Sequence, residues 1–393
     1  MFGCLILVIS FGARASFGLF LPEMTVARDW SRELFSFSYA IQNLVWGLAG
    51  PFLGAYADKF GARRVLLAGG LLYMLGIVGM AYAESGTMLV LTSGLMLGVA
   101  VGATAFGIIF SVLGKIIPED KRSLAFGVGT ASGSLGQFLF LPLSGILIDS
   151  IGWHSALLVL AALAALIMLL AIGVGGHRQS QASSSDISLG QALSTAMRDR
   201  SFHLLFWGYF VCGLQVVFIG LHLPVYLQDQ GLSANVGATA VALIGLFNIV
   251  GSISSGYLAQ RVSKKKLLTT LYVLRSLVMI AFLLLPLSVV SVYLFAGAMG
   301  LLWLSTVAPT TALVGQMYGV KYLGMLGGII FFGHQIGSFL GAWLGGRIFD
   351  MTGSYDMAWL MVILFGAFAA LMHMPIDQRP LTDRKPQPAV GVA

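Results

Sequence analysis

Residues 54–64 read GAYADKFGARR, a short basic segment between two long apolar runs. Residues 256–266, GYLAQRVSKKK, repeat it 202 positions later, with glycine, alanine and basic residues at matching places. The same offset aligns Gly18-Leu19-Phe20-Leu21-Pro22 with Gly220-Leu221-His222-Leu223-Pro224. An offset of 201 then matches Gly136, Gly145, Asp149 and Gly152 with Gly337, Gly346, Asp350 and Gly353. A nearly constant offset over most of each half predicts a chain built from two copies of one unit.

The composition predicts that this chain lies in a membrane. Of its 393 residues, 58% are hydrophobic and 9% are charged, whereas about 25% are charged in a typical soluble domain. So few charges cannot cover a soluble particle of this size, and we expect most of the outer surface to face lipid. The net charge of +7 therefore does not indicate a nucleic-acid-binding protein or a water-exposed enzyme.

The sequence lacks the usual motifs of an enzyme, a metalloprotein or an ATP-driven pump. Cys4 and Cys212 both lie inside apolar runs, with no zinc or disulfide spacing. No Walker loop, HExxH or GxSxG motif occurs. We therefore expect no catalytic site, no metal and no cofactor.

Apolar runs of about 20 residues or more, enough to cross the hydrocarbon layer, divide the chain into twelve predicted spans. They are 3–27, 34–57, 64–83, 87–114, 122–148, 153–174, 201–228, 235–260, 266–287, 290–317, 321–348 and 356–374. With the repeat, they predict an all-α membrane protein with 12 transmembrane helices in two pseudo-symmetric six-helix bundles. The predicted bundles are 1–174 and 201–375, joined by a polar cytoplasmic linker of flexible composition, 175–200, and followed by a cytoplasmic tail, 376–393.

Basic residues are unequally distributed between the loops. With the amino terminus inside, 17 Lys and Arg fall on the cytoplasmic side and three on the outer side. The positive-inside rule then places both termini in the cytoplasm. The first apolar run starts almost at Met1 without a positively charged leader, so we expect a retained span and no signal peptide. Short loops and the lack of an N-x-[ST] sequon indicate a multi-pass protein of the bacterial inner membrane.

The basic segment 54–64 resembles the signature loop between spans two and three of the major facilitator superfamily. It departs from that pattern at Tyr56 and Ala62, where an aliphatic and a basic residue are more usual. The span count, the central linker and the repeat extend the resemblance over essentially the whole chain. The resemblance implies a secondary transporter that works by alternating access.

Three further stretches resemble the bacterial monocarboxylate-transporter-like and oxalate/formate-antiporter-like branch of that superfamily. They are FGLFLPEM at the end of the first span, GLQVVFIGLHLPVYL in the seventh, and GHQIGSFLGAWLGGRIFDMTGSYD from the eleventh onward. The chain departs from this branch in span eight, where monocarboxylate carriers place an acid or amide and an Arg one turn apart. The matching positions here are Asn248 and Ser252.

Ionisable groups inside spans are functional candidates, because an unpaired charge in hydrocarbon is costly. Arg14 lies 11 residues into the first span, about 16 Å deep at the helical rise, which is near the midplane. Its guanidinium either binds a substrate carboxylate or is a structural strut held by carbonyls or an amide. Arg275 lies nearer the cytoplasmic face on a peripheral helix, and we interpret it as structural.

Other polar side chains share helix faces inside the spans. Gln215 and His222 lie on one stripe of span seven with Phe218 and Tyr226, a stripe expected to face the cavity. The further substrate-binding candidates are Asn248 and Ser252 in span eight, Trp303 and Thr306 in span ten, and His334 and Gln335 in span eleven. Each has an alternative role in packing or in bridging helices.

Two further features predict moving parts. Asp58, with Lys59 and Arg63 beside it, is expected to form a cytoplasmic gate by pairing with a basic residue or with a helix N-terminus of the opposite half. Glycines recur at every fourth residue in two helices, which allows backbones to approach closely, and we expect sliding contacts between the halves there. They are Gly333, Gly337, Gly341 and Gly345, and Gly129 and Gly133.

The sequence places no Asp or Glu in the middle of a span, so the cavity is expected to be electropositive and to have no carboxylate proton relay. His222 and His334 are the remaining candidates for proton coupling. We predict a secondary active transporter of a small organic anion, most simply a carboxylate, that is proton-coupled or exchanging and works as a monomer in the bilayer. One alternative is an exporter of neutral or amphipathic compounds. Another is a transport-defective membrane sensor.

Overall fold

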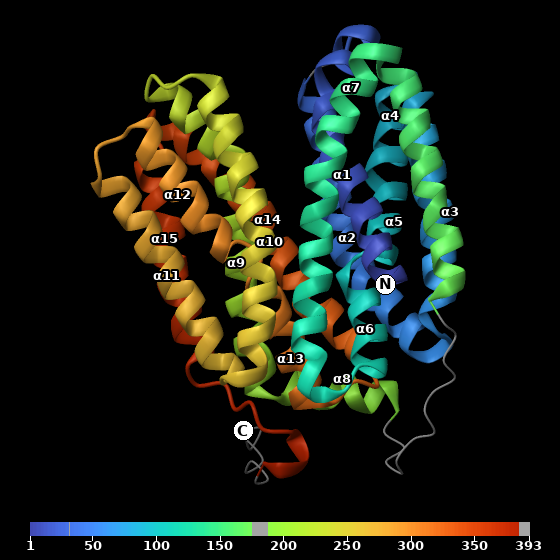
Figure 1. Ribbon diagram of the computed structural model, residues 1–393, viewed down its shortest axis with the longest axis vertical. Coiled ribbons are helices and arrows are strands. Elements are labelled where there is room, and N and C mark those ends of the chain that lie inside the picture. The colour runs from blue at the N-terminus through green and yellow to red at the C-terminus, as the bar shows by residue number, and fades with distance from the viewer. Residues whose placement is uncertain (31, 175–187, 385–393) are drawn as a thin grey trace, which may run out of the picture.

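The computed structural model describes residues 1–30, 32–174 and 188–384, and every regular element in this part is helical (Figure 1). The first half contains α1 (Phe2–Arg28), α2 (Arg32–Phe60), α3 (Ala62–Ala81), α4 (Gly86–Leu89), the π-helical η1 (Val90–Met96), α5 (Leu97–Thr104), α6 (Phe106–Ile116) and α7 (Glu119–Gly173). The second contains α8 (Leu189–Arg198), α9 (Arg200–Asp229), α10 (Ala234–Arg261), α11 (Lys264–Leu284), α12 (Val289–Leu302), α13 (Val307–Tyr318), α14 (Leu323–Thr352), α15 (Asp356–His373) and the short 3₁₀ turn η2 (Leu381–Asp383).

These helices account for the twelve predicted spans. Ten segments of the described chain are long and apolar enough to cross a membrane. The longest, α7, is two spans, because Gly152 has a non-helical backbone (φ 78°, ψ 158°) that turns the chain. The 29-residue α2 supplies the remaining span. The all-helical, twelve-span prediction is therefore confirmed, with helix ends within a few residues of the predicted ones.

Two spans are broken at positions that the internal repeat relates. Span four is interrupted at Ala105, an extended residue between α5 and α6. Span ten is interrupted between α12 and α13, after Leu302 and before Val307. Ala105 and Thr306 are 201 positions apart, which is the offset of the repeat. In transporters, broken helices supply backbone groups near the translocation path.

The two halves of the chain form two groups of helices that meet at the lower end of Figure 1 and diverge toward the upper end. Contacts between the groups follow two seams, α2 against α14 and α7 against α10. At the first seam, Gly54 packs so closely on the backbone of Gly324 that a Cβ would overlap its carbonyl. At the second, Gly127 and Gly256 bring their backbones together. We call the lower end, where Gly54 meets Gly324, the closed end.

The predicted glycine ladders do not lie at these seams, so that prediction is wrong. Gly337 and Gly341 pack against the backbone of α9, in the same half as α14. Gly129 and Gly133 face Phe110 and Phe106, again within one half. The fourfold repeat requires close packing on some neighbour, but it does not specify which neighbour.

The segment predicted as a flexible linker is partly helical. Its residues 175–187 lie outside the described chain, but α8 follows with Ser188 and Gln191 forming a reciprocal capping box. Asp199 then caps α9 by accepting a hydrogen bond from the Ser201 backbone N–H at 2.9 Å. Favourable caps explain why a polar, Ser/Gln-rich stretch becomes ordered next to the helix bundle.

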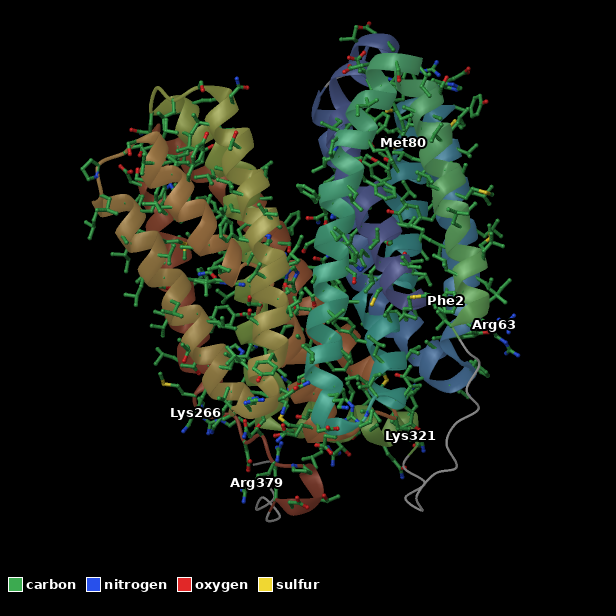
Figure 2. All side chains as sticks on the ribbon, in the orientation of Figure 1. Phe2, Arg63, Met80, Lys266, Lys321 and Arg379 are labelled. Atoms are coloured by element: carbon green, nitrogen blue, oxygen red, sulfur yellow. The ribbon has the colours of Figure 1, made fainter. Side chains whose placement is uncertain are left out.

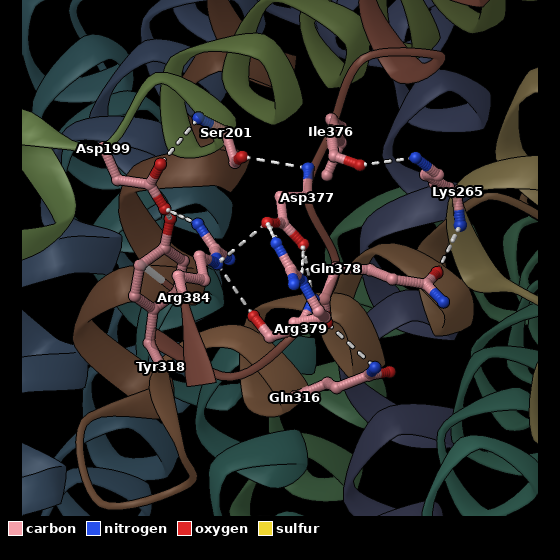
Figure 3. Close-up of polar contacts among 10 residues, drawn as sticks. All are labelled: Asp199, Ser201, Lys265, Gln316, Tyr318, Ile376, Asp377, Gln378, Arg379 and Arg384. Atoms are coloured by element: carbon pink, nitrogen blue, oxygen red, sulfur yellow. Dashed lines mark hydrogen bonds and ion pairs between the residues drawn. The ribbon is translucent and has the colours of Figure 1, made fainter. Parts of the chain in front are cut away.

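Residues after α15 fold back across the ends of α9, α11 and α13 (Figure 3). Arg384 forms an ion pair with Asp199 at 2.6 Å, and the Tyr318 hydroxyl donates to the same carboxylate at 2.6 Å. The Lys265 ammonium donates to the carbonyl of Ile376 at 2.8 Å. Hydrogen bonds from Arg379 lower the pKa of Asp377 to about 2, so this carboxylate stays charged at physiological pH. The tail thus ties three helix ends of one half together.

Basic side chains gather at the closed end (Figure 2). The labelled Arg63, Lys266, Lys321 and Arg379 lie toward this end, whereas Met80 lies toward the opposite one. The predicted cytoplasmic loops therefore share one end of the molecule.

Candidate functional site

The guanidinium of Arg14 lies at midspan of α1 between two aromatic rings. Its Cζ is 4.9 Å from the ring centroids of both Tyr39 and Trp46, a cation–π arrangement. Its Nη2 donates to Asn43 Oδ1 at 2.5 Å, and the Asn43 amide nitrogen donates to the carbonyl of Tyr39 at 2.9 Å, which orients the amide. The Nε of Arg14 is buried and has no partner. Ion pairs in the described chain do not include Arg14.

A hydrogen-bond chain connects Arg14 to the opposite half across the α2–α14 seam. Gln335 donates from Nε2 to the Asn43 carbonyl at 3.1 Å, and its Oε1 lies 3.2 Å from His334 Nδ1. Ser338 lies 2.9 Å from the carbonyl of His334 and donates to it. Of the predicted site residues, Arg14, His334 and Gln335 are therefore brought together, although 320 positions separate the first two.

Aromatic rings in contact accompany this hydrogen-bond chain across the same seam. Trp46 faces Phe331 at 4.9 Å between centroids, and Phe331 stacks on His334 at 5.1 Å with an interplanar angle of 11°. The ring of Tyr209 also packs on His334, with 5.2 Å between the ring centroids. The layer from Arg14 to Tyr209 is thus both aromatic and polar, and it is shared by the two halves.

Asn248 and Ser252 lie at the second seam, and their polar groups are used internally. Asn248 donates from its amide to Ser134 Oγ of the opposite half at 2.6 Å. Its Oδ1 accepts from Ser252 Oγ at 3.1 Å and from the Leu304 N–H, in the break of span ten, at 2.9 Å. This pair therefore bridges the halves and supports the broken helix.

Arg275, on α11, is fully buried and supports the same break in span ten. Its Nε and Nη2 donate to the Leu302 carbonyl at 3.0 and 2.6 Å, and Nη2 also donates to the carbonyl of Trp303. Its Nη1 lies 3.5 Å from Cys212 Sγ and from Gln215 Oε1. Thr306 pairs with Cys212 at 3.1 Å. Unlike Arg14, Arg275 has a partner for each of its nitrogens.

The polar stripe of span seven was predicted to face the cavity. In the structure it packs against α14 and α15 of its own half. Gln215 donates to the carbonyl of Val362 at 3.0 Å. His222 lies 2.9 Å from the Ala342 carbonyl and 3.3 Å from the Tyr355 hydroxyl. Phe218 packs edge-on against Trp359 at 5.2 Å. The periodicity identified a single face correctly, but that face is a packing surface between helices.

Asp58 at the closed end connects the two halves. One carboxylate oxygen accepts from Ser111 Oγ and from Lys115 Nζ of α6, both at 2.7 Å. The other accepts from the Met325 N–H at the start of α14, in the opposite half, at 2.9 Å. Asp58 thus pairs with a basic residue of its own half and with the N-terminus of a helix of the opposite half. Lys59 and Arg63 are exposed, and the hydrogen bonds of Asp58 in the described chain go to Ser111, Lys115 and Met325 instead.

Several residues that contribute to the site were not among the predicted site residues. Asn43 and Trp46 form a polar and aromatic cluster on α2 that is hard to distinguish from ordinary packing in one sequence. Phe331 lies one turn before Gln335 and carried no signal of its own. Lys115 was counted only as a loop charge, although its position at the end of α6 places it beside Asp58.

The chain forms two helical groups that span a membrane and meet at two seams, and a half-buried guanidinium lies near the first seam. This is the architecture of an alternating-access transporter. The family model described as Major Facilitator Superfamily matches residues 3–342 of the chain. The chain belongs to this superfamily and is a multi-pass secondary transporter, not an enzyme.

Known proteins similar to this chain are transporters as well. The uncharacterized MFS-type transporter YcxA of Bacillus subtilis (strain 168) is 26% identical over 371 residues, covering 92% of this chain and 90% of that protein. Monocarboxylate transporter 13 of Bos taurus is 28% identical over 402 residues, covering 98% and 90%.

Among solved structures, the E. coli fucose:proton symporter FucP (N162A) superposes with a TM-score of 0.73 at 14% identity, covering 95% of this chain and 97% of that one. The proton:xylose symporter XylE gives 0.73 at 13% identity and 96% coverage of both. At these identities the structures establish the shared fold alone.

Proposed function

We propose that this transporter moves a small organic anion, most simply a carboxylate, and that Arg14 binds its negative charge. The observation that carries the proposal is the guanidinium of Arg14: its Nε is buried and unpartnered, and the ion pairs of the described chain do not neutralise its charge. An unpaired charge inside a span is costly, and a substrate anion would supply the missing partner in each transport cycle. Guanidinium groups bind carboxylates through two parallel N–H donors.

The hydrogen bonding of the two intraspan arginines favours a substrate with one negative charge. Arg275 is 0% exposed, and its donors are used by backbone carbonyls, Cys212 and Gln215. Arg14 is half-buried and keeps a free donor. The guanidinium of Arg14 is therefore the one intraspan cation of the described chain available to a substrate, and it can neutralise one carboxylate. The relatives named monocarboxylate transporters agree with this class, although the arginine that such carriers place in span eight is Ser252 here.

We propose that the closed end faces the cytoplasm of a bacterial cell and that Asp58 holds it shut. The basic side chains at this end support the orientation through the positive-inside rule. Asp58 links α2 and α6 to the N-terminus of α14, which is the contact that must break when the halves rock. The proposed bundles, 1–174 and 201–375, would move as the two rocking units.

For energy coupling, the geometry favours His334 over His222. His334 lies at the seam, joined through Gln335 to the residue that orients Arg14. His222 is enclosed by α14 and α15 of its own half. A proton on His334 is therefore placed to influence substrate binding, and proton symport or anion exchange are the two modes to distinguish.

Counterflow in proteoliposomes tests this proposal. Liposomes loaded with an unlabelled monocarboxylate should accumulate the labelled form transiently, and Arg14→Gln liposomes should not. Binding without counterflow would indicate the receptor-like alternative. Transport of neutral or amphipathic compounds with equal activity in Arg14→Gln would support the exporter alternative and refute the anion assignment.

A further inference from the structure

An apolar space lies between the Arg14–His334 layer and the closed end. It consists of two small cavities that share Phe106, Gly107 and Phe331 in their walls. Trp46 lines the first cavity and also carries the Arg14 guanidinium against its ring. Tyr209, which packs on His334, lines the second. The two cavities thus share three wall residues, and each also borders a residue that packs against the candidate site.

The walls of this space are uncharged and are partly formed by glycines. No charged residue lines either cavity in the described chain. Gly107 is exposed although it lies inside span four, and a Cβ built on it meets no atom within 4 Å. Gly327 of α14 likewise has open space where a Cβ would lie. At Gly107 and Gly327 the missing side chain leaves the space open, whereas Gly328, which also lines it, packs closely on the backbone of α2.

We propose that this space receives the hydrocarbon tail of the transported anion and that Gly107 sets the tail length. The inference rests on the proposed function, because it needs the carboxylate at Arg14. A tail that passes the edge of Trp46 then enters apolar walls, where burial is favourable and a second charge would be unpaired. Each cavity has room for about two water-sized groups, which suits a tail of roughly three or four carbons.

The test measures the affinity of straight-chain monocarboxylates from formate to hexanoate at one pH. In the wild type, the Kd should fall about fourfold for each added methylene until the space is full. Gly107→Ala should move the optimum to a chain about one carbon shorter, and Gly107→Val should move it further. The affinities for formate and acetate should stay unchanged in both variants.

Gly145→Val is the matched control. Gly145 lies inside α7, its Cβ also meets nothing within 4 Å, and it lines neither cavity. This variant should keep the wild-type length profile. Should Gly107→Val fail to fold, Gly107→Ala carries the test, since alanine adds one methyl group and raises helix propensity.

Two results overturn the proposal in different ways. If the wild type binds monocarboxylates and the Gly107 variants keep its length profile, the tail assignment is wrong and the proposed function stands. If the wild type binds none of these acids, the proposed function fails, and the tail assignment fails with it.

Discussion

Hydrogen-bond partners distinguish the two arginines that lie inside spans. Sequence depth alone identified Arg14 as the better candidate, since it lies nearer the midplane. The structure adds the reason: Arg275 is held by the carbonyls of Leu302 and Trp303, whereas Arg14 has one side-chain acceptor, Asn43, and a free Nε. These partners could not be predicted, because they come from residues 29 and 27 positions away on other helices.

His334 should be needed for coupling to a pH gradient. We expect His334→Gln to abolish accumulation driven by the gradient and to keep exchange, because glutamine keeps a hydrogen bond to Gln335 but cannot be protonated. His222→Gln is the matched control and should couple normally, since His222 bonds within its own half. Uptake into proteoliposomes with and without the gradient measures both. Normal coupling in His334→Gln would leave exchange as the better account.

Asp58→Asn should slow transport and leave substrate affinity within a few-fold. The amide keeps the size of the carboxylate but is uncharged, so it loses the ion pair to Lys115 and accepts more weakly from the Met325 N–H, the hydrogen bond that joins the two halves. Because this contact biases conformations and touches no substrate, the effect should appear in turnover. Comparison of counterflow rates with equilibrium binding checks this expectation. Wild-type turnover in Asp58→Asn would remove Asp58 from the gate.

At the scale of helices, the positions of the spans could be predicted from the sequence. The neighbour that each helix face contacts could not. Apolar length predicted all twelve spans, and the repeat offset relates the breaks at Ala105 and Thr306. The face that each helix turns to its neighbour depends on tertiary packing. The stripe of Gln215 and His222 and the glycines of α14 were therefore placed at the wrong interface, although their helical spacing was read correctly.

Gly54→Ala should weaken the closed end. A Cβ at Gly54 would overlap the Gly324 carbonyl, a backbone atom that cannot rotate away, so α2 and α14 must separate. Gly50→Ala is the matched control, because its Cβ would lie 3.9 Å from the Gly328 carbonyl, an ordinary contact. Spin labels at exposed Arg63 and Lys266, in a background without Cys4 and Cys212, measure the separation of the halves. Longer distances are expected in Gly54→Ala only, and identical distributions would contradict this packing.

For the whole molecule, the central point is that its halves meet at two seams of different chemistry. The α2–α14 seam carries Arg14, Gln335 and His334, while the α7–α10 seam carries the bridge from Asn248 to Ser134. The internal repeat predicted two similar halves, and this much follows from one sequence. The repeat does not predict which residues meet between the halves, because these contacts join positions more than 100 residues apart.

The most direct test of the central claim is the affinity of purified Arg14 variants for a monocarboxylate that the wild type binds. Arg14→Lys keeps the charge but loses the planar fork, so binding should weaken, and Arg14→Gln should lose about 2–5 kcal/mol of binding free energy. The melting temperature of the same samples shows that the protein is folded. Wild-type affinity in folded Arg14→Gln would make Arg14 a structural strut and contradict the anion assignment.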